Sequence, residues 1–224
     1  MLNYMDQYLL ENLAQELKIA PLNIVRENAE LAFLHQLSQN NIAKRLIFYG
    51  GTALRLAYNS PRFSEDLDFL MTGKISAKEL ASLMAGLEKE TGFSLKDLKD
   101  KRNTLFALLN VADPALKHPI NIKIEISKKK NGLKTEYLPL VSPCSPFKPI
   151  IQTATIQSLK NLKMQVIKDR QDPKDWFDLW YITKYLKEKY EPPVKFPFDK
   201  TEFERQLKRF LPKDKWMVIK QIYD

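Results

Sequence analysis

The stretch that decides the fold, residues 46–71, reads LIFYGGTALRLAYNSPRFSEDLDFLM. Its apolar start at 46–49 predicts a buried strand, and Gly50-Gly51 predicts a tight turn into a short helix over 52–58. We expect Thr52 to cap this helix, and the sequence Asn-Ser-Pro at 59–61 to end it. Polar and apolar residues then alternate from 64 to 70, which predicts a second strand.

Asp66 and Asp68 lie two positions apart on this second strand, so both carboxylates project from one face while Leu67 and Phe69 point into the core. Two parallel carboxylates repel each other unless a cation lies between them. Mg²⁺, or Mn²⁺ in its place, suits such a pair because it is a hard ion that prefers oxygen ligands. An Asp-x-Asp pair also occurs on ordinary solvated strands, so the pair alone does not decide the function.

The two glycines have two interpretations. A turn from a strand through Gly50-Gly51 into a helix lets backbone N–H groups approach a phosphate closely. It also occurs as an ordinary strand-to-helix connection. The combination favours the phosphate interpretation, because a turn, a short helix and then carboxylates on the next strand allow a phosphate tail and metal ions to meet.

Working outward, residues 1–40 show the spacing of two helices, and residues 76–91 form an amphipathic pattern closed by Gly92. Alternation predicts strands between 93 and 142, with a hairpin turn at the lysines 128–130 and Asn131-Gly132. Prolines from 139 to 149 indicate a linker. The helices expected beyond it span 155–170, 174–189, 200–210 and 213–223.

A third carboxylate lies in the segment Asn121-Ile-Lys-Ile-Glu-Ile-Ser127. Its isoleucines face one way, and Lys123, Glu125 and Ser127 face the other. If this strand lies beside the strand of Asp66 and Asp68, Glu125 completes a metal-binding triad and Lys123 can neutralise phosphate. Alternatively, this is a half-exposed edge strand on which Lys and Glu only provide solubility.

These segments resemble the AbiEii/AbiGii toxin family, whose members are nucleotidyltransferase-like proteins of bacterial toxin–antitoxin and phage-defence systems, related to the MenT toxins. The stretch FYGGTALR at 48–55, Tyr58 and the stretch RFSEDLDF at 62–69 are similar to its first motif. Lys123-Ile-Glu125 is similar to the second motif. Lys163, Arg170, Lys174-Asp175 and Asp178-Leu-Trp180 follow the order of the third, so the resemblance spans about 46–182.

The resemblance implies roles for the third motif. Lys163 and Arg170 are two helical turns apart on one face, where two cations can hold a triphosphate and stabilise the leaving pyrophosphate. Asp175 and Asp178 begin the next helix; one can orient Lys163, and one can accept a proton from the incoming hydroxyl. Asp175 can also be an ordinary aspartate favoured by the helix dipole.

Composition limits the alternatives. A formal charge of +9 and a pI of about 9.4 favour approach to a polyanion without identifying one. Cys144, the single cysteine, cannot form an internal disulfide, and we expect a reduced thiol in a cytoplasmic protein. No apolar run reaches the roughly 18–20 residues of a membrane helix, and no signal peptide is visible at the start.

Together these features predict an α+β fold. The expected parts are an N-terminal helical layer at 1–44, a nucleotidyltransferase-like core with a mixed sheet at 45–142, and a C-terminal helical region at 152–224. Asp66, Asp68 and Glu125 are expected to bind metal, and Lys163 and Asp178 to take part in the chemistry. The residues expected to bind nucleotide are Gly50, Gly51, Thr52, Arg55, Ser64, Lys123, Arg170 and Asp175, although Arg55 and Lys163 can instead hold the site together.

The function expected from the resemblance is transfer of NMP from an NTP to an acceptor hydroxyl, with the 3′ end of tRNA as the implied acceptor and a cognate antitoxin as a partner. Two alternatives remain open. The same scaffold can serve a small-molecule or protein acceptor, and a non-catalytic module can keep the pocket only to bind NTP or RNA. The presence of all three carboxylates argues against the non-catalytic alternative.

Overall fold

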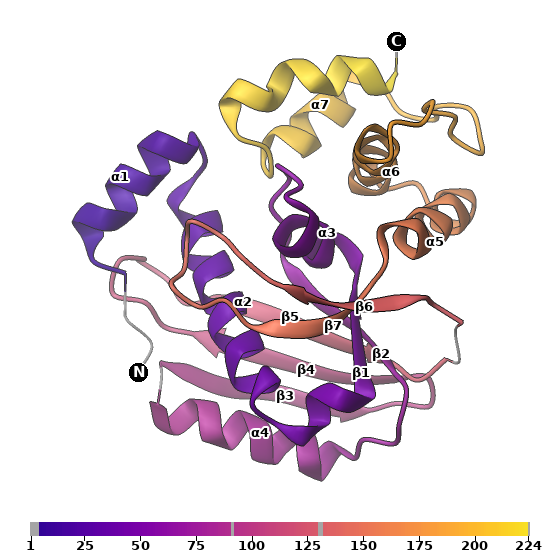
Figure 1. Ribbon diagram of the computed structural model, residues 1–224. Helices are drawn as coiled ribbons and strands as arrows, with labels where there is room; N and C mark the ends of the chain where they lie inside the picture. Colours follow the sequence, from indigo (N-terminus) through magenta and orange to yellow (C-terminus); the bar gives the residue numbers. More distant parts are fainter. Residues whose placement is uncertain (1–4, 91, 130–131, 224) are drawn as a thin grey trace.

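The computed structural model describes residues 5–90, 92–129 and 132–223 (Figure 1). Its strands form one mixed sheet in the order β3-β4-β5-β2-β1-β7-β6. The strands are β1 (Leu46–Tyr49), β2 (Asp66–Met71), β3 (Phe93–Asp100), β4 (Thr104–Val111), β5 (Ile120–Ser127), β6 (Thr135–Pro139) and β7 (Ile150–Ala154). The α-helices are α1 (Gln7–Leu17), α2 (Pro21–Ser38), α3 (Gly50–Tyr58), α4 (Ala77–Glu90), α5 (Ile156–Asp169), α6 (Pro173–Tyr185) and α7 (Lys200–Lys208). The 3₁₀ helices are η1 (Asn41–Arg45) and η2 (Lys213–Ile222). The predicted α+β fold is confirmed.

The centre of the sheet holds the strand with the two aspartates. β2 runs antiparallel to β1 and parallel to β5, and β5 also pairs with β4 in antiparallel register. β1 pairs with β7 in parallel. Parallel neighbours require a crossover in the chain, and this crossover brings β5 beside β2 although roughly fifty residues separate them.

Two expectations about the sheet were wrong. β5 and β6 do not form a hairpin, because β6 pairs with β7 at the opposite edge of the sheet. Part of the proposed turn, residues 130–131, lies outside the described residues. The segment 150–154, for which no strand was expected and part of which was assigned to the C-terminal helical region, forms strand β7 next to β1, so the sheet takes strands from beyond residue 142.

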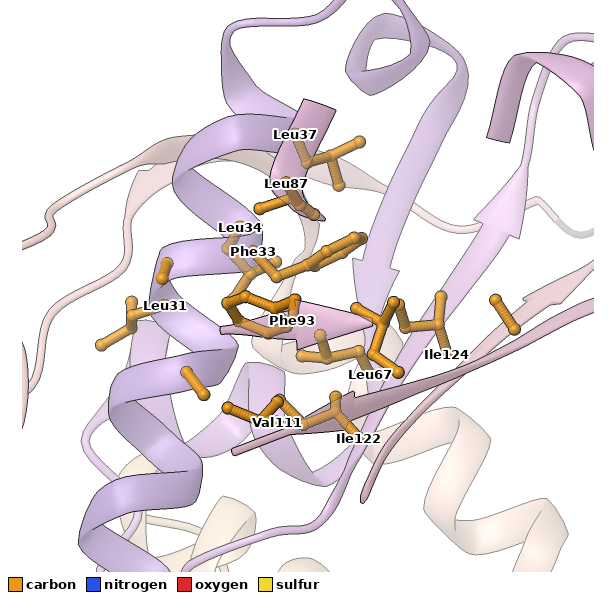
Figure 2. Close-up of a cluster of buried hydrophobic side chains, with 14 of the residues drawn as sticks. Leu31, Phe33, Leu34, Leu37, Leu67, Leu87, Phe93, Val111, Ile122 and Ile124 are labelled. Carbon is orange, nitrogen blue, oxygen red and sulfur yellow. The ribbon is translucent and has the colours of Figure 1, made fainter. Parts of the chain in front are cut away.

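One face of the sheet is covered by α2 and α4 and carries the largest apolar core (Figure 2). Leu67 and Phe69 on β2 point into this core and are fully buried, as predicted from the alternation. Helix α4 starts with a capping box, since Ser76 accepts from the backbone N–H of Glu79 while the Glu79 carboxylate accepts from the Ser76 N–H. The face covered by α2 and α4 is therefore the one whose packing stabilises the fold.

The opposite face is covered unequally. Over β1, β2 and β7 lie α3, α5 and α6, which pack through a smaller apolar cluster that includes Ile47, Leu54 and Leu159 (Figure 1). A third cluster joins α6, α7 and η2. Over β4, by contrast, Thr104, Phe106, Leu108 and Asn110 remain partly exposed. In the described part of the chain, no helix combines the length and apolarity needed to cross a membrane.

Candidate functional site

Three carboxylates meet on the open side of the sheet because of the β2–β5 register. Asp68 on β2 lies directly opposite Glu125 on β5, and Asp66 lies opposite Lys123. Residues opposite each other in neighbouring strands share a face, so all four side chains project to the same side. The condition set by the sequence, that the strand of Glu125 lies beside the strand of Asp66 and Asp68, is met.

The lysine of this group neutralises part of the negative charge. The Lys123 Nζ lies 3.0 Å from Asp66 Oδ2 and 3.8 Å from Glu125 Oε1, so its ammonium stands between two of the carboxylates. Burial, and then the charges of Asp66 and Glu125, raise the pKa of Asp68 to about 6. Near Asp68, the positive charge of the site therefore does not balance the negative charge of its carboxylates.

This donor set fits a divalent cation, although it is not already assembled around one point. Among the described residues, no three Asp, Glu, His or Cys side chains converge closely enough to hold a metal ion. The Lys123 ammonium lies between Asp66 and Glu125, so these two carboxylates already face one positive charge. Oxygen donors of this kind suit Mg²⁺ or Mn²⁺.

The glycine turn fits closely against the carboxylates. Gly50 has a φ of +87°, which disfavours other residues, and a Cβ there would lie 2.5 Å from Asp68 Oδ2. A Cβ on Gly51 would lie 2.3 Å from Arg62 Nη2 and 2.8 Å from Ser64 Oγ. The glycines therefore let the start of α3 approach the charged groups of the site.

The expected cap of α3 was wrong. The helix begins at Gly50, two residues before Thr52, and Tyr49 takes the N-cap position without a side-chain hydrogen bond. The buried Thr52 instead donates its hydroxyl to the Asp66 carbonyl at 2.5 Å. Because this hydroxyl is used inside the protein, Thr52 fixes the start of β2, and its hydroxyl is not free to contact a phosphate.

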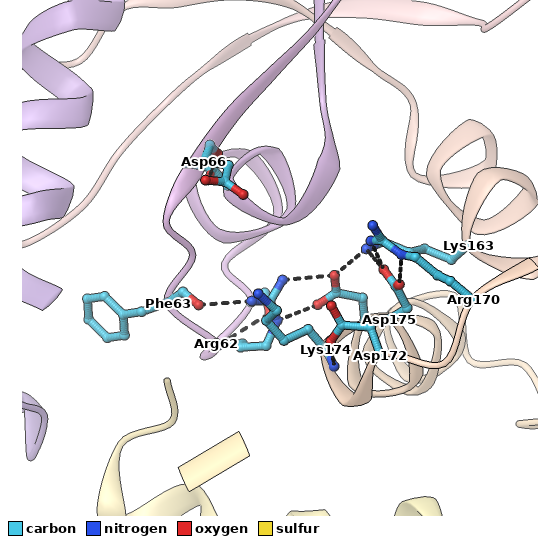
Figure 3. Close-up of polar contacts among 11 residues, drawn as sticks. Arg62, Phe63, Asp66, Lys163, Arg170, Asp172, Lys174 and Asp175 are labelled. Carbon is cyan, nitrogen blue, oxygen red and sulfur yellow. Dashed lines mark hydrogen bonds and ion pairs between the residues drawn. The ribbon is translucent and has the colours of Figure 1, made fainter. Parts of the chain in front are cut away.

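A network of charged side chains links α5 and α6 to the loop before β2 (Figure 3). Lys163 Nζ lies 2.7 Å from Asp175 Oδ1 and 2.6 Å from Asp178 Oδ2. Arg170 donates through Nε to Asp175 Oδ2 at 2.8 Å. Arg62 donates from Nε and Nη2 to the two oxygens of Asp178, at 2.7 and 2.9 Å. These three cations and two carboxylates form one connected cluster.

The cluster keeps its charges over a wide pH range. Burial alone would raise the pKa of Asp175, but Lys163 and Arg170 lower it to about 2. Burial likewise opposes ionisation of Asp178, yet Arg62 and Lys163 hold its pKa below the ordinary value. Burial would lower the pKa of Lys163, but Asp178 and Asp175 raise it. With three positive and two negative groups, the cluster has a net positive charge beside the cleft.

This geometry corrects one expectation about the aspartates. Asp178 is fully buried and both of its oxygens are bound, so it cannot accept a proton from an incoming hydroxyl. Asp175 is also buried, but it lines the cleft and holds Lys163 and Arg170 toward it. Both aspartates therefore position cations.

The two groups of residues face each other across one cleft of about 780 Å³. Its wall takes residues from β2, β5, the glycine turn, α5 and α6. From the sequence-predicted site, the residues lining it are Gly50, Gly51, Ser64, Asp66, Asp68, Lys123, Glu125, Lys163, Arg170 and Asp175. Segments that are distant in the sequence thus form one surface with carboxylates on one side and cations on the other.

Arg55 lies away from this wall. Its guanidinium donates from Nε to Glu27 Oε2 at 2.7 Å and from Nη1 to the Ser60 carbonyl at 3.0 Å, and it stacks over the Phe63 ring at 3.9 Å. It therefore ties α2 to α3 and to the loop before β2. Of the two roles considered for Arg55, the structure favours holding the site together.

Sequence reasoning missed the role of Arg62, which is 3% exposed and joins the loop before β2 to α6. In the sequence, Arg62 stands out only as the first residue of the motif RFSEDLDF. Its position between a proline and the Asp-x-Asp strand gives no local signal of burial. Asn103 and Lys129, which also line the cleft, were missed as well.

Comparisons with known proteins identify similar folds and a family. The structure is similar to JHP933 from Helicobacter pylori, with a TM-score of 0.56 and 23% identity over 84% of this chain and 74% of that protein. It is also similar to a candidate nucleotidyltransferase from H. pylori, with a TM-score of 0.52 and 23% identity over 87% of this chain and 80% of the other. At these identities the likeness concerns the fold. No curated protein matches the sequence.

The profile of the AbiEii nucleotidyl transferase toxin of type IV toxin–antitoxin systems matches residues 32–218. The matched region contains both aspartates of β2, the third carboxylate on β5 and the cationic cluster of α5 and α6. With this match over most of its length and a nucleotidyltransferase-like fold around the cleft, the chain belongs to the AbiEii nucleotidyl transferase family of type IV toxins.

Proposed function

We propose that this nucleotidyltransferase uses a divalent metal to transfer NMP from an NTP to the 3′-terminal hydroxyl of tRNA, and that it acts in the cytoplasm as the toxin of a phage-defence pair with an antitoxin. The observation that carries this proposal is the β2–β5 register. It places Asp68 opposite Glu125 and Asp66 beside them, in the same cleft as Lys163 and Arg170. Carboxylates for metal and cations for a triphosphate are the two requirements of this chemistry.

The carboxylates Asp66, Asp68 and Glu125 would hold Mg²⁺ or Mn²⁺. When bound, the metal lowers the charge on the phosphates and activates the attacking oxygen. Lys123 is 36% exposed, so its ammonium can leave the carboxylates and turn to a phosphate oxygen. Lys123 therefore stabilises the carboxylates before the NTP binds and contacts a phosphate once the NTP is bound.

The triphosphate would lie between the start of α3 and the cationic cluster. The backbone N–H groups at Gly50 and Gly51, the Ser64 hydroxyl and the ammonium of Lys163 surround that part of the cleft. The acceptor oxygen forms a bond to the α-phosphorus, the bond to the β-phosphate oxygen breaks, and pyrophosphate leaves while the hydroxyl proton passes to water. Because Asp175 and Asp178 fix Lys163 in advance, its charge is in place when negative charge develops on the leaving pyrophosphate.

The test is incubation of the purified protein with Mg²⁺ or Mn²⁺, each labelled NTP in turn, and total tRNA. We expect label on the tRNA with at least one NTP, and none after addition of a chelator. Asp66→Asn should abolish the transfer, whereas the control Glu11→Gln, which changes an exposed residue on the distant helix α1, should not.

The result also separates the alternatives. Label on a protein or a small molecule, identified by mass spectrometry, would replace tRNA as the acceptor while keeping the reaction. Tight NTP binding by calorimetry without any transfer, from a protein with an intact melting curve, would refute the enzymatic proposal. Growth arrest on expression, relieved by the product of a neighbouring gene, would support the toxin role.

A further inference from the structure

We infer that the open face of β3 and β4 binds the terminal nucleotides of a single-stranded RNA 3′ end, with Phe106 stacking against a base. This inference rests on the proposed function, for which it assigns the acceptor side of the cleft. The surface, called here the β3–β4 platform, consists of Phe106, Lys99, Lys101 and Asn103. The function proposed above requires an acceptor site but places no residue in it.

The platform continues the row of catalytic carboxylates across the sheet. Asp68 lies opposite Glu125, Glu125 opposite Phe106, and Phe106 opposite Lys99. The four side chains therefore share one face, in neighbouring strands about 5 Å apart. An aromatic ring on β4 directly beside the third carboxylate is close enough for a base to stack there while its sugar hydroxyl lies at the carboxylates.

This face of β4 is open to solvent. The alternate residues Leu105, Ala107 and Leu109 are fully buried under α2 and α4, whereas Phe106 and Leu108 are only partly buried on the other side. Asn103 and Lys129 line the cleft at this end, which shows that the cleft extends toward the platform.

The charge around Phe106 suits a polyanion. Lys99 Nζ and Lys101 Nζ lie 6.0 and 5.9 Å from the centre of its ring. Lys99 also pairs with Asp97, so part of the charge is compensated. Residues 96–102 and 128–129 nevertheless contain six basic and two acidic residues, a surplus of four positive charges. Aromatic rings flanked by lysines are typical of surfaces that bind single-stranded nucleic acid.

The direction of the reaction indicates that the acceptor binds on this side of the carboxylates. The cations expected to hold the triphosphate, Lys163 and Arg170, come from α5 and its C-terminal end, and α5 packs beside α3. In an in-line displacement the attacking oxygen enters opposite the leaving pyrophosphate. The side of the carboxylates away from these cations is β5 followed by β4 and β3. The acceptor therefore approaches over the platform.

The experiment measures binding of a fluorescein-labelled, mixed-sequence single-stranded RNA of about 10 nucleotides to the full chain by anisotropy. Phe106→Ala should weaken binding by about 5- to 100-fold, and Phe106→Trp should restore it. Lys99→Gln with Lys101→Gln should lower the slope of log K against log salt by about 1.4. Tyr137→Ala, at an exposed aromatic on β6 at the other edge of the sheet, is the matched control and should bind as the wild type does.

Separate readouts distinguish the two proposals. Binding of an NTP analogue with a methylene between the α- and β-phosphates, measured by calorimetry, should be the same for Phe106→Ala and the wild type. Loss of NTP binding with unchanged RNA binding would overturn the inference, because Phe106 would then stack on the nucleotide substrate. The inference would also be overturned if Phe106→Ala left the affinity for RNA unchanged, or if the wild type did not bind RNA. RNA binding that depends on Phe106 without label transfer would support the platform while the proposed reaction fails.

Discussion

Replacing Asp68 with asparagine should stabilise the metal-free protein at neutral pH while abolishing nucleotidyl transfer. The reason is the environment of this carboxyl group, where burial and the neighbouring charges of Asp66 and Glu125 raise its pKa from 3.8 to about 6. Above that pH the folded protein must keep Asp68 ionised at a cost in free energy. Asparagine has nearly the same shape and does not carry this charge.

The magnitude follows from the pKa. The difference between 3.8 and about 6 is roughly two pH units, which corresponds to about 3 kcal/mol if the group is fully shielded from water. Because Asp68 is partly exposed, solvent screening reduces this to about 1–2 kcal/mol. For a protein of 224 residues, that gain in free energy of unfolding raises Tm by about 2–8 °C.

The pH dependence provides the strictest check. The folded state binds more protons than the unfolded state between pH 3.8 and about 6, so the wild type loses stability as pH rises through this window. The advantage of Asp68→Asn should therefore be complete above about pH 6 and should disappear as pH falls toward 3.8. Urea unfolding and thermal melts at pH 4, 5, 6 and 8 would measure it.

A remote carboxylate is the control for these melts. Glu11→Gln, at an exposed position of α1, should leave Tm unchanged at each pH. If Asp68→Asn melts at or below the wild type at pH 8, the assignment of unfavourable charge to this site is refuted. An equal gain at pH 4 and pH 8 would refute the ionisation argument, because the gain would then not depend on the charge.

Three further outcomes can be measured. Arg62→Met should destabilise the fold by about 3–5 kcal/mol in urea unfolding, because it leaves the fully buried Asp178 without its bidentate partner; a loss below 1 kcal/mol would contradict the role given to this ion pair. Gly51→Ala should cost about 1–3 kcal/mol and impair transfer, because its Cβ would meet the Arg62 guanidinium at 2.3 Å and Asp178 prevents that group from moving; wild-type stability and activity would show that the contact can relax. Cys144 is buried and burial raises the pKa of its thiol, so iodoacetamide at pH 8 should modify the native protein far more slowly than the urea-unfolded protein; equal rates, followed by mass spectrometry, would exclude a protected thiol.

Local periodicity predicted the elements that carry the site. Alternation along 64–70 and 120–127 placed Asp66, Asp68 and Glu125 on the polar faces of strands, and the structure shows these strands. Two-residue periodicity depends only on the geometry of an extended chain, so the sequence is sufficient to reveal it. The helices at 156–169 and 173–185 were predicted to within a few residues for the same kind of reason.

Strand pairing was predicted less well. Lysines followed by Asn131-Gly132 suggested a hairpin, yet β6 pairs with β7 at the far edge. The short strand β7 sits beside β1 in parallel, and such a pair is separated by a long stretch of chain. Its pairing is determined by which apolar faces are buried together, and no local turn signal reports this.

The sequence by itself determined which residue types stand on which face: paired aspartates on one strand, Lys and Glu on another, and glycines where the chain turns into α3. Only the tertiary structure decided that Glu125 lies opposite Asp68, and that Asp178 is bound by Arg62 from 116 positions away. The physical reason is that backbone geometry fixes the direction of neighbouring side chains. Contacts between distant segments depend instead on burial of the whole core. For this reason Asp178, which in the sequence resembled a proton acceptor, is the fixed ion-pair partner of a cation.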